Sequence, residues 1–257
     1  MALHDFLLLL AAGLAGGTIS ALVGGAALVT FPALLATGLT PISAAAVNMV
    51  ALAPGNLLAA LSDRAQLPPL DRSFAGLVFA SLAGAAIGAG LLLLTPDRVF
   101  ALLVPLLLGF ATILFAVSPR VSASLRARAT ARGDSGPYRW GNSIAALMPV
   151  SIYGGYFGGG VGVLLLAVLS VGTGGDYRAA NVTKNLITSL NSIVASSIFI
   201  VQGVVSWRPA LAMMAGALAG SVLGGLLARV LPNWIARTLV VIFGTLLTIA
   251  FARRYWF

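Results

Sequence analysis

The chain has 257 residues, of which 60% are hydrophobic and only 8% are charged, and its mean hydropathy is +1.04. A soluble domain carries about 25% charged residues, so this composition excludes a soluble protein and indicates an integral membrane protein. The 15 Lys and Arg residues outnumber the 6 Asp and Glu residues and give a net charge of +9. Because the arginines lie mainly between apolar segments, we interpret this charge as an orientation signal rather than as a sign of nucleic-acid binding.

The length of the chain allows about eight membrane crossings at about 20 apolar residues per span, which leaves no room for a soluble catalytic domain. Apolar runs bounded by charged residues, Pro or Gly predict spans at residues 5–37, 41–62, 73–95, 98–118, 142–171, 178–202, 207–230 and 234–252. We therefore predict an all-α polytopic membrane protein. It is divided into a first transmembrane repeat at residues 1–118, a basic cytoplasmic linker at 119–141 and a second transmembrane repeat at 142–257.

Glycines interrupt the first and the fifth predicted spans, which are the longest. The first break contains Gly24 and Gly25, and the second contains Gly158, Gly159 and Gly160. Broken backbone at membrane depth is tolerated only where it is buried in protein or lines a cavity, because lipid cannot hydrogen-bond the freed groups. The two breaks therefore predict a duplicated site where free N–H groups and helix N-termini face an anion.

An internal repeat accompanies these breaks at an offset of about 135 residues, which pairs Gly24 with Gly159, Asn48 with Thr183, and Asn56 with Asn191. Duplicated halves of this kind are typical of transporters. Four full spans per half make the repeats parallel in the membrane. If the first and fifth segments are instead broken into re-entrant pairs of helices, the number of crossings in each half becomes odd and the repeats become inverted.

Glycines also recur four residues apart in the third and seventh predicted spans, at Gly84 and Gly88 and at Gly220 and Gly224. This spacing lets helix backbones approach closely. Since nothing polar accompanies these glycines, we interpret them as helix packing and assign them no ligand site.

The segment between the two halves, from Pro119 to Trp140, is the only extended polar segment, and it carries Arg120, Arg126, Arg128, Arg132 and Arg139. The positive-inside rule places it in the cytoplasm. If successive spans cross the membrane in opposite directions from there, ten arginines, including Arg64, lie inside, and four, including Arg178, lie outside. We therefore expect a multi-pass protein of the inner (plasma) membrane with both termini in the cytoplasm.

The residues around the two breaks resemble the TauE/SafE family of sulfite exporters. The first stretch is Val23-Gly24-Gly25-Ala26-Ala27-Leu28-Val29-Thr30-Phe31-Pro32 with Ala45-Ala46-Val47-Asn48 after it, and the second is Tyr156-Phe157-Gly158-Gly159-Gly160-Val161-Gly162 with Ala179-Ala180-Asn181-Val182-Thr183-Lys184-Asn185 after it. The resemblance covers nearly the whole chain. It implies a permease for sulfite, sulfoacetate or a related organosulfonate in the bacterial inner membrane, with export as the expected direction.

Two positions depart from the family pattern in the first half. Ala26 follows Gly25 where a third glycine is common, and Val47 stands where the first repeat often carries Thr. The resemblance therefore implies a drier site in the first half than in relatives.

Lys184 is the only lysine in the chain, and it lies inside a predicted apolar span. A cation at membrane depth costs on the order of 3 kcal/mol on insertion scales, so it normally faces an interior cavity and has a partner. An anionic substrate is one such partner. The alternative is that the span starts later and that Lys184 extends to the outer interface.

Amide and hydroxyl side chains near Lys184 and in the first half can donate hydrogen bonds to sulfite or sulfonate oxygens. Asn48 and Asn56 are eight residues apart, as are Thr183 and Asn191, so each pair lies near one helical face. Asparagine also joins transmembrane helices to each other, which is the structural alternative. The predicted substrate-binding residues are Gly24, Gly25, Asn48, Asn56, Gly158, Gly159, Gly160, Thr183, Lys184 and Asn191.

The residue types that catalysis and metal binding need are scarce. The chain has no Cys and a single His, His4, so neither a thiolate metal site nor a disulfide framework is predicted. It has no Glu, and its six aspartates, which map to loops or span ends, are Asp5, Asp63, Asp71, Asp97, Asp134 and Asp176. We therefore expect no enzyme activity, no cofactor and no metal.

These patterns together predict an anion permease that works by alternating access around a midplane site between the two halves. Its expected partners are a small anionic substrate and the lipid bilayer, with no nucleic acid, and a homodimer is left open. The alternative is an assembly or interaction subunit that transports nothing. The sequence does not reveal the exact substrate or the coupling ion.

Overall fold

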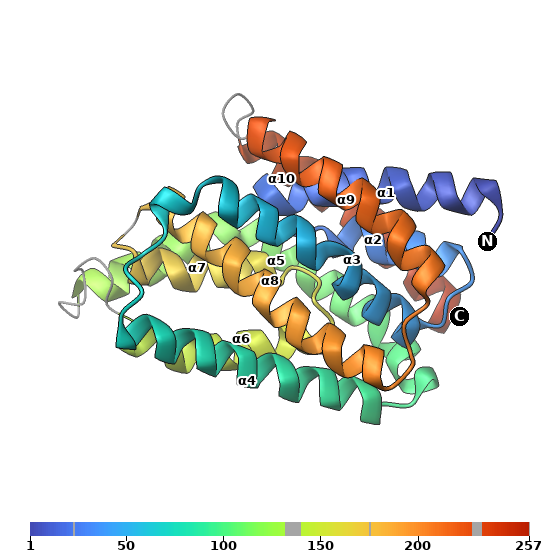
Figure 1. Cartoon of the computed structure of the whole chain (residues 1–257), viewed down its shortest axis with the longest axis horizontal. Helices are drawn as coiled ribbons and strands as arrows, with labels where there is room; N and C mark the ends of the chain where they lie inside the picture. The colour runs from blue at the N-terminus through green and yellow to red at the C-terminus, as the bar shows by residue number, and fades with distance from the viewer. Residues whose placement is uncertain (23, 132–139, 175, 228–232, 257) are drawn as a thin grey trace.

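The computed structural model describes residues 1–22, 24–131, 140–174, 176–227 and 233–256, and the described part is helical throughout (Figure 1). It contains α1 (Leu3–Leu22), α2 (Ala27–Ala36), α3 (Pro41–Ser62), the short 3₁₀ helix η1 (Arg64–Gln66), α4 (Arg72–Leu94), α5 (Asp97–Ala131), α6 (Gly141–Tyr156), α7 (Val161–Gly172), α8 (Tyr177–Val201), α9 (Trp207–Leu227) and α10 (Asn233–Trp256). Seven described helices are long and apolar enough to cross a membrane. The predicted all-α polytopic fold class is confirmed.

The two predicted breaks separate short helices from longer ones. Helix α1 ends at Leu22 and α2 spans 10 residues, while α6 ends at Tyr156 and α7 spans 12 residues. At a rise of about 1.5 Å per residue, α2 and α7 are about 15–18 Å long, too short for a hydrocarbon core of about 30 Å. Gly24 and Gly158, with φ of 72° and 77°, adopt the left-handed conformation that starts each turn. The broken first and fifth segments are therefore confirmed.

Each short helix runs back toward the end from which the preceding helix came. At one end of the molecule, the Tyr177 hydroxyl donates to the carbonyl of Leu22, which links the start of α8 to the end of α1. At the other end, the Ser43 hydroxyl donates to the carbonyl of Val204, which links the start of α3 to the residues after α8. Helix α2 leads back from the first end toward the second, so the α1–α2 segment is re-entrant.

Small residues pack two helix pairs closely, α1 with α9 and α4 with α6. A Cβ atom on Gly220 would overlap the carbonyl oxygen of Leu14, and one on Gly88 would overlap that of Ile152. Backbones at this separation exclude any larger side chain. The predicted packing role of these glycines is confirmed.

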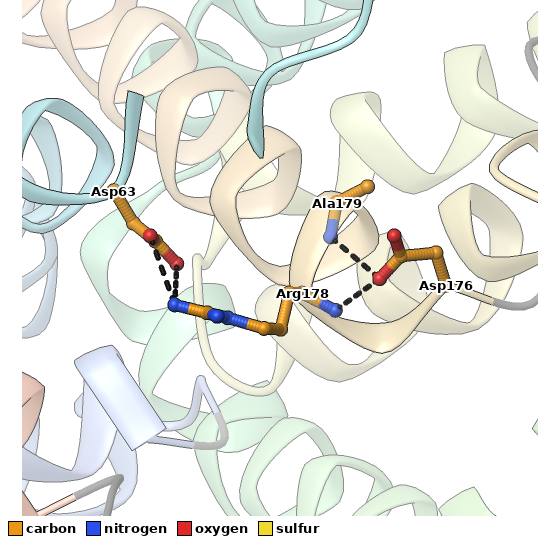
Figure 2. A network of polar contacts seen from close by, with 4 residues as sticks. All are labelled: Asp63, Asp176, Arg178 and Ala179. Carbon is orange, nitrogen blue, oxygen red and sulfur yellow. Dashed lines mark hydrogen bonds and ion pairs between the residues drawn. The ribbon is translucent and has the colours of Figure 1, made fainter. Parts of the chain in front are cut away.

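The connections gather at two opposite ends of the helix bundle. We call one the Arg178 end, because Arg178 Nη2 lies 3.2 Å from Asp63 Oδ1 and thereby joins the start of α8 to the end of α3 (Figure 2). We call the other the termini end, because both chain termini lie there (Figure 1). The indole N–H of Trp256 donates to the carbonyl of Leu102, which places the start of α5 at the termini end too.

This arrangement corrects the relative placement of helix ends that we deduced from eight full spans. That scheme put Arg64 and Arg178 on opposite sides, but the ion pair of Asp63 with Arg178 puts them at the same end. It also put the linker on the side of both termini, whereas α5 runs away from the termini end for 35 residues to Ala131 (Figure 1). The physical reason is that α2 and α7 each add one reversal of the chain.

The first part of the predicted linker is helical, since α5 continues through Ala131. Arg132, Asp134, Gly136, Pro137 and Arg139 lie outside the described residues.

Candidate functional site

The two glycine breaks meet inside the protein. A Cβ atom on Gly24 would lie 2.9 Å from the Cα atom of Gly162, which is in the first turn of α7. Beside this contact is a cavity of about 40 Å³. The residues that line it come from α1, α2, α3, α6, α7, α8 and the two breaks: Ser20, Gly24, Gly25, Ala26, Ala27, Asn48, Met49, Leu52, Asn56, Gly154, Gly158, Val161, Gly162, Lys184, Thr188, Asn191 and Ser192.

Lys184 extends from α8 into this cavity and is only 1% exposed. Its ammonium group donates to the carbonyl oxygen of Ser20 at 3.0 Å. Asn181 and Tyr177, earlier on the same helix, donate to the carbonyls of Ala21 and Leu22. The start of α8 therefore binds the last carbonyls of α1, which have no partner within their own helix.

No carboxylate pairs with Lys184 among the described residues. Asp63 pairs with Arg178, and Asp176 accepts from the backbone N–H groups of Arg178 and Ala179 at the start of α8 (Figure 2). A buried ammonium group that meets only one neutral carbonyl has lost most of its hydration and gained a single hydrogen bond in return. It is thus a strong attractor for an anion that enters the cavity.

Asn48 and Asn56 face the cavity from α3 with their amide oxygens already bound. The Thr30 hydroxyl donates to Asn48 Oδ1, and the Ser20 hydroxyl donates to Asn56 Oδ1 at 2.6 Å. The structure gives neither Nδ2 group an acceptor among the described residues. The hydroxyls therefore orient both amides so that N–H donors are left for a ligand.

Asn191 also lines the cavity, but its amide is fully engaged by other side chains. Ser81 donates to Asn191 Oδ1 at 2.9 Å, and Asn191 Nδ2 donates to Ser151 Oγ at 3.2 Å. The two serine hydroxyls lie 2.7 Å apart. This network joins α4, α6 and α8, so Asn191 holds the wall of the cavity together.

Seven of the ten predicted residues line the cavity, and Gly159, Gly160 and Thr183 do not. Thr183 is buried, and its hydroxyl donates to the carbonyl of Ala179 in its own helix. It precedes Lys184 by one residue, a rotation of about 100° around the helix, so the two side chains leave α8 on different faces. The carbonyl of Gly159 accepts from the Tyr153 hydroxyl and shapes the turn.

Sequence reasoning missed three lining residues that matter to the chemistry, which are Ser20, Met49 and Thr188. Thr188 lies one helical turn after Lys184, so helical periodicity could have found it. Met49 lies 135 residues before Lys184, which is the offset of the predicted repeat. Nothing in the sequence singles out Ser20, because its role depends on how α1 packs against α3.

Backbone donors complete the site at the two helix N-termini that border it. Among the described residues, the N–H groups of Gly25 and Ala26 at the start of α2 have no backbone acceptor, nor do those of Val161 and Gly162 at the start of α7. All four residues line the cavity. Helix N-termini carry partial positive charge and free N–H groups, so both favour an anion between them.

Broken helices that direct their N-termini at a buried polar cavity, within a polytopic helical bundle, define the architecture of a membrane transporter. Residues 9–251 match the family described as Sulfite exporter TauE/SafE. The chain belongs to this family, as its sequence motifs had indicated.

Relatives with similar sequences are described as transporters. The chain is 27% identical over 251 residues to "Probable membrane transporter protein ORF9" of a Sinorhizobium species, covering 97% of this chain and 93% of the relative. It is 23% identical over 241 residues to a "Probable membrane transporter protein" of Haemophilus influenzae, covering 94% of this chain and 92% of the relative. It is 25% identical over 227 residues to "Probable membrane transporter protein YfcA" of Escherichia coli K12, covering 88% of this chain and 81% of the relative. No solved structure gave a significant match.

Proposed function

We propose that the protein is a permease for a small sulfur-containing anion, with sulfite as the favoured substrate and sulfoacetate or a related organosulfonate as the wider class. The observation that carries this proposal is Lys184, a buried cation without a carboxylate partner among the described residues, at a cavity where two helix N-termini converge. The description of the matching family supports sulfite. The amide donors of Asn48 and Asn56 suit oxyanion oxygens.

The size of the cavity favours the compact member of this class. One water needs about 10–15 Å³ of such space, so a cavity of about 40 Å³ holds about three water-sized groups. Sulfite has one sulfur and three oxygen atoms and matches this size. Sulfoacetate is larger and requires the walls to move apart.

Alternating access fits the way in which the two halves are arranged. The ends of α1 and α6, and the starts of α3 and α8, are about 135 residues apart, as expected for a repeat. Helix α1 starts at the termini end, while α6 starts at the opposite end (Figure 1). We infer that residues 1–118 and 142–257 are inverted repeats that move around the cavity between them, and that the protein transports by alternating access.

The orientation that we propose follows from the arginines and places the Arg178 end in the cytoplasm. By sequence position, ten of the fourteen arginines belong to helix ends or connections at the Arg178 end, and Arg98, Arg208, Arg253 and Arg254 belong to the termini end. The positive-inside rule then puts both termini outside the cytoplasm. This proposal replaces our expectation of cytoplasmic termini and keeps the inner membrane as the location. Export remains the proposed direction.

A flux measurement tests the site. Purified protein in liposomes should move sulfite, and Lys184→Met should abolish this flux because the buried charge that attracts the anion is gone. Arg178→Gln is the matched control, since Arg178 is an exposed cation on the same helix and exposed ion pairs contribute little. Sulfite flux through Lys184→Met at the wild-type rate would overturn the site, and a wild-type protein that moves neither sulfite nor a sulfonate would overturn the function.

A further inference from the structure

Thr188 presents an unused hydroxyl group at the cavity. The residue lies on α8, one turn after Lys184, and lines the cavity. Its Oγ1 atom is buried and has no hydrogen-bond partner. A buried hydroxyl without a partner is costly to keep, so a ligand that accepts its hydrogen bond recovers that cost.

This state is unusual among the threonines of the described residues. A threonine in a helix can donate to the carbonyl four residues earlier. In the described residues, the threonines whose hydroxyl lies within hydrogen-bond distance of that carbonyl are Thr18, Thr30, Thr95, Thr112, Thr173, Thr183, Thr245 and Thr248. For Thr188 the equivalent acceptor is the carbonyl of Lys184, and the structure contains no such bond.

The position of Thr188 relative to Lys184 suits a ligand of a few atoms. Residues four apart on a helix have Cβ atoms about 5–6 Å apart on the same face. A compact oxyanion between the two side chains can place one oxygen at the ammonium group and another at the hydroxyl.

The facing wall of the cavity does not offer the same pair of groups. At the matching offset of 135 residues, Met49 corresponds to Lys184 and Ala53 to Thr188. Both are apolar, so only the α8 side provides the ammonium and hydroxyl pair. The ammonium and hydroxyl pair therefore occurs on one side of the cavity.

We propose that the Thr188 hydroxyl donates a hydrogen bond to the transported anion while Lys184 binds another oxygen of the same anion. This inference rests on the proposed function, because it needs the cavity to be the substrate site. It adds a binding residue to that site.

The test compares Thr188→Val, which keeps the shape, with Thr188→Ser, which keeps the hydroxyl. In proteoliposomes, Thr188→Val should raise the sulfite concentration for half-maximal flux about tenfold or more, as expected for a lost hydrogen bond to a charged group. Thr188→Ser should stay close to wild type. Ser196→Ala is the matched control, since Ser196 Oγ is also buried without a partner on α8 but lies outside the cavity lining.

Stability separates a binding role from a structural one. The melting temperature of Thr188→Val without ligand should not fall, because the hydroxyl has no protein partner, while the stabilisation by added sulfite should shrink. Thr188→Ala serves as a second variant if the valine form does not fold. Wild-type affinity and flux for sulfite in the hydroxyl-free variants would refute the inference alone. A wild-type protein that neither binds nor transports sulfite would refute the proposed function and this inference with it.

Discussion

Individual side chains in the cavity have two different tasks, and hydrogen-bond partners distinguish them. Asn48 and Asn56 have bound oxygens and available N–H groups, which suits a ligand. Asn191 has the same side chain, but both ends of its amide are bound to serines. The predicted repeat pairs Asn56 with Asn191, yet the structure gives the two amides different partners. Positions that the predicted repeat pairs therefore need not share a role.

Removing the Asn191 amide should lower stability. In Asn191→Leu, the hydroxyls of Ser81 and Ser151 keep only each other as partners, so we expect a loss of about 1–3 kcal/mol. A lower melting temperature of the purified protein in detergent measures this. Ser197→Ala is the control, since Ser197 is exposed on the same helix and bonds only within it. Unchanged stability of Asn191→Leu would mean that the network does not hold α4, α6 and α8 together.

The residue types of the site were predictable from sequence, but their partners were not. Lys184 stood out as the only lysine, in an apolar span. Thr183 was chosen for its place in the repeat, yet its hydroxyl bonds within α8. Which face of a helix meets a cavity depends on packing with other helices, and a single sequence with weak amphipathic patterning does not record that.

At the scale of helices, two glycine patterns have different physical causes. The glycines of the breaks occupy positive-φ positions and let the chain turn at membrane depth. The glycines of α4 and α9 lie within regular helix and make room for a neighbouring backbone. Both patterns were visible in the sequence, because glycine spacing reports them directly. The re-entrant path of α2 and α7 was left open, since their lengths become clear only when the helix boundaries are known.

The close packing of α1 and α9 predicts the effect of adding one methyl group. A Cβ atom on Gly220 would overlap the carbonyl oxygen of Leu14, whereas one on Gly225 meets nothing within 4 Å. We expect Gly220→Ala to destabilise the protein by about 1–3 kcal/mol, as overpacking does. Gly225→Ala should be neutral or slightly stabilising, because alanine favours the helix. Thermal unfolding of the two variants in detergent measures the difference, and equal stability would contradict the observed interface.

For the whole molecule, the two reversals at α2 and α7 decide which ends of the helices share a membrane face. Apolar runs predicted the number and place of the long segments well, because hydrophobicity sets them. The placement of Arg64 and Arg178 on opposite sides was wrong because the scheme counted each broken segment as a single span. The ion pair between Asp63 and Arg178 contradicts that placement. Both orientations assign ten arginines to one face and four to the other, so charge counting alone does not distinguish them.

The proposed orientation predicts that the termini end faces away from the cytoplasm. The chain has no cysteine, so single cysteines introduced at exposed alanines report on each face without altering its charge. Ala2 lies at the termini end, and Ala65 lies in η1 beside Asp63 at the Arg178 end. A membrane-impermeant thiol reagent added to spheroplasts should modify Ala2→Cys at once, because the positive-inside rule keeps the arginine-rich end in the cytoplasm. Ala65→Cys should react only after the membrane is permeabilised. The reverse pattern would show that the termini are cytoplasmic, as first expected. Labelling of both positions from outside would contradict the placement of η1 and the N-terminus at opposite ends.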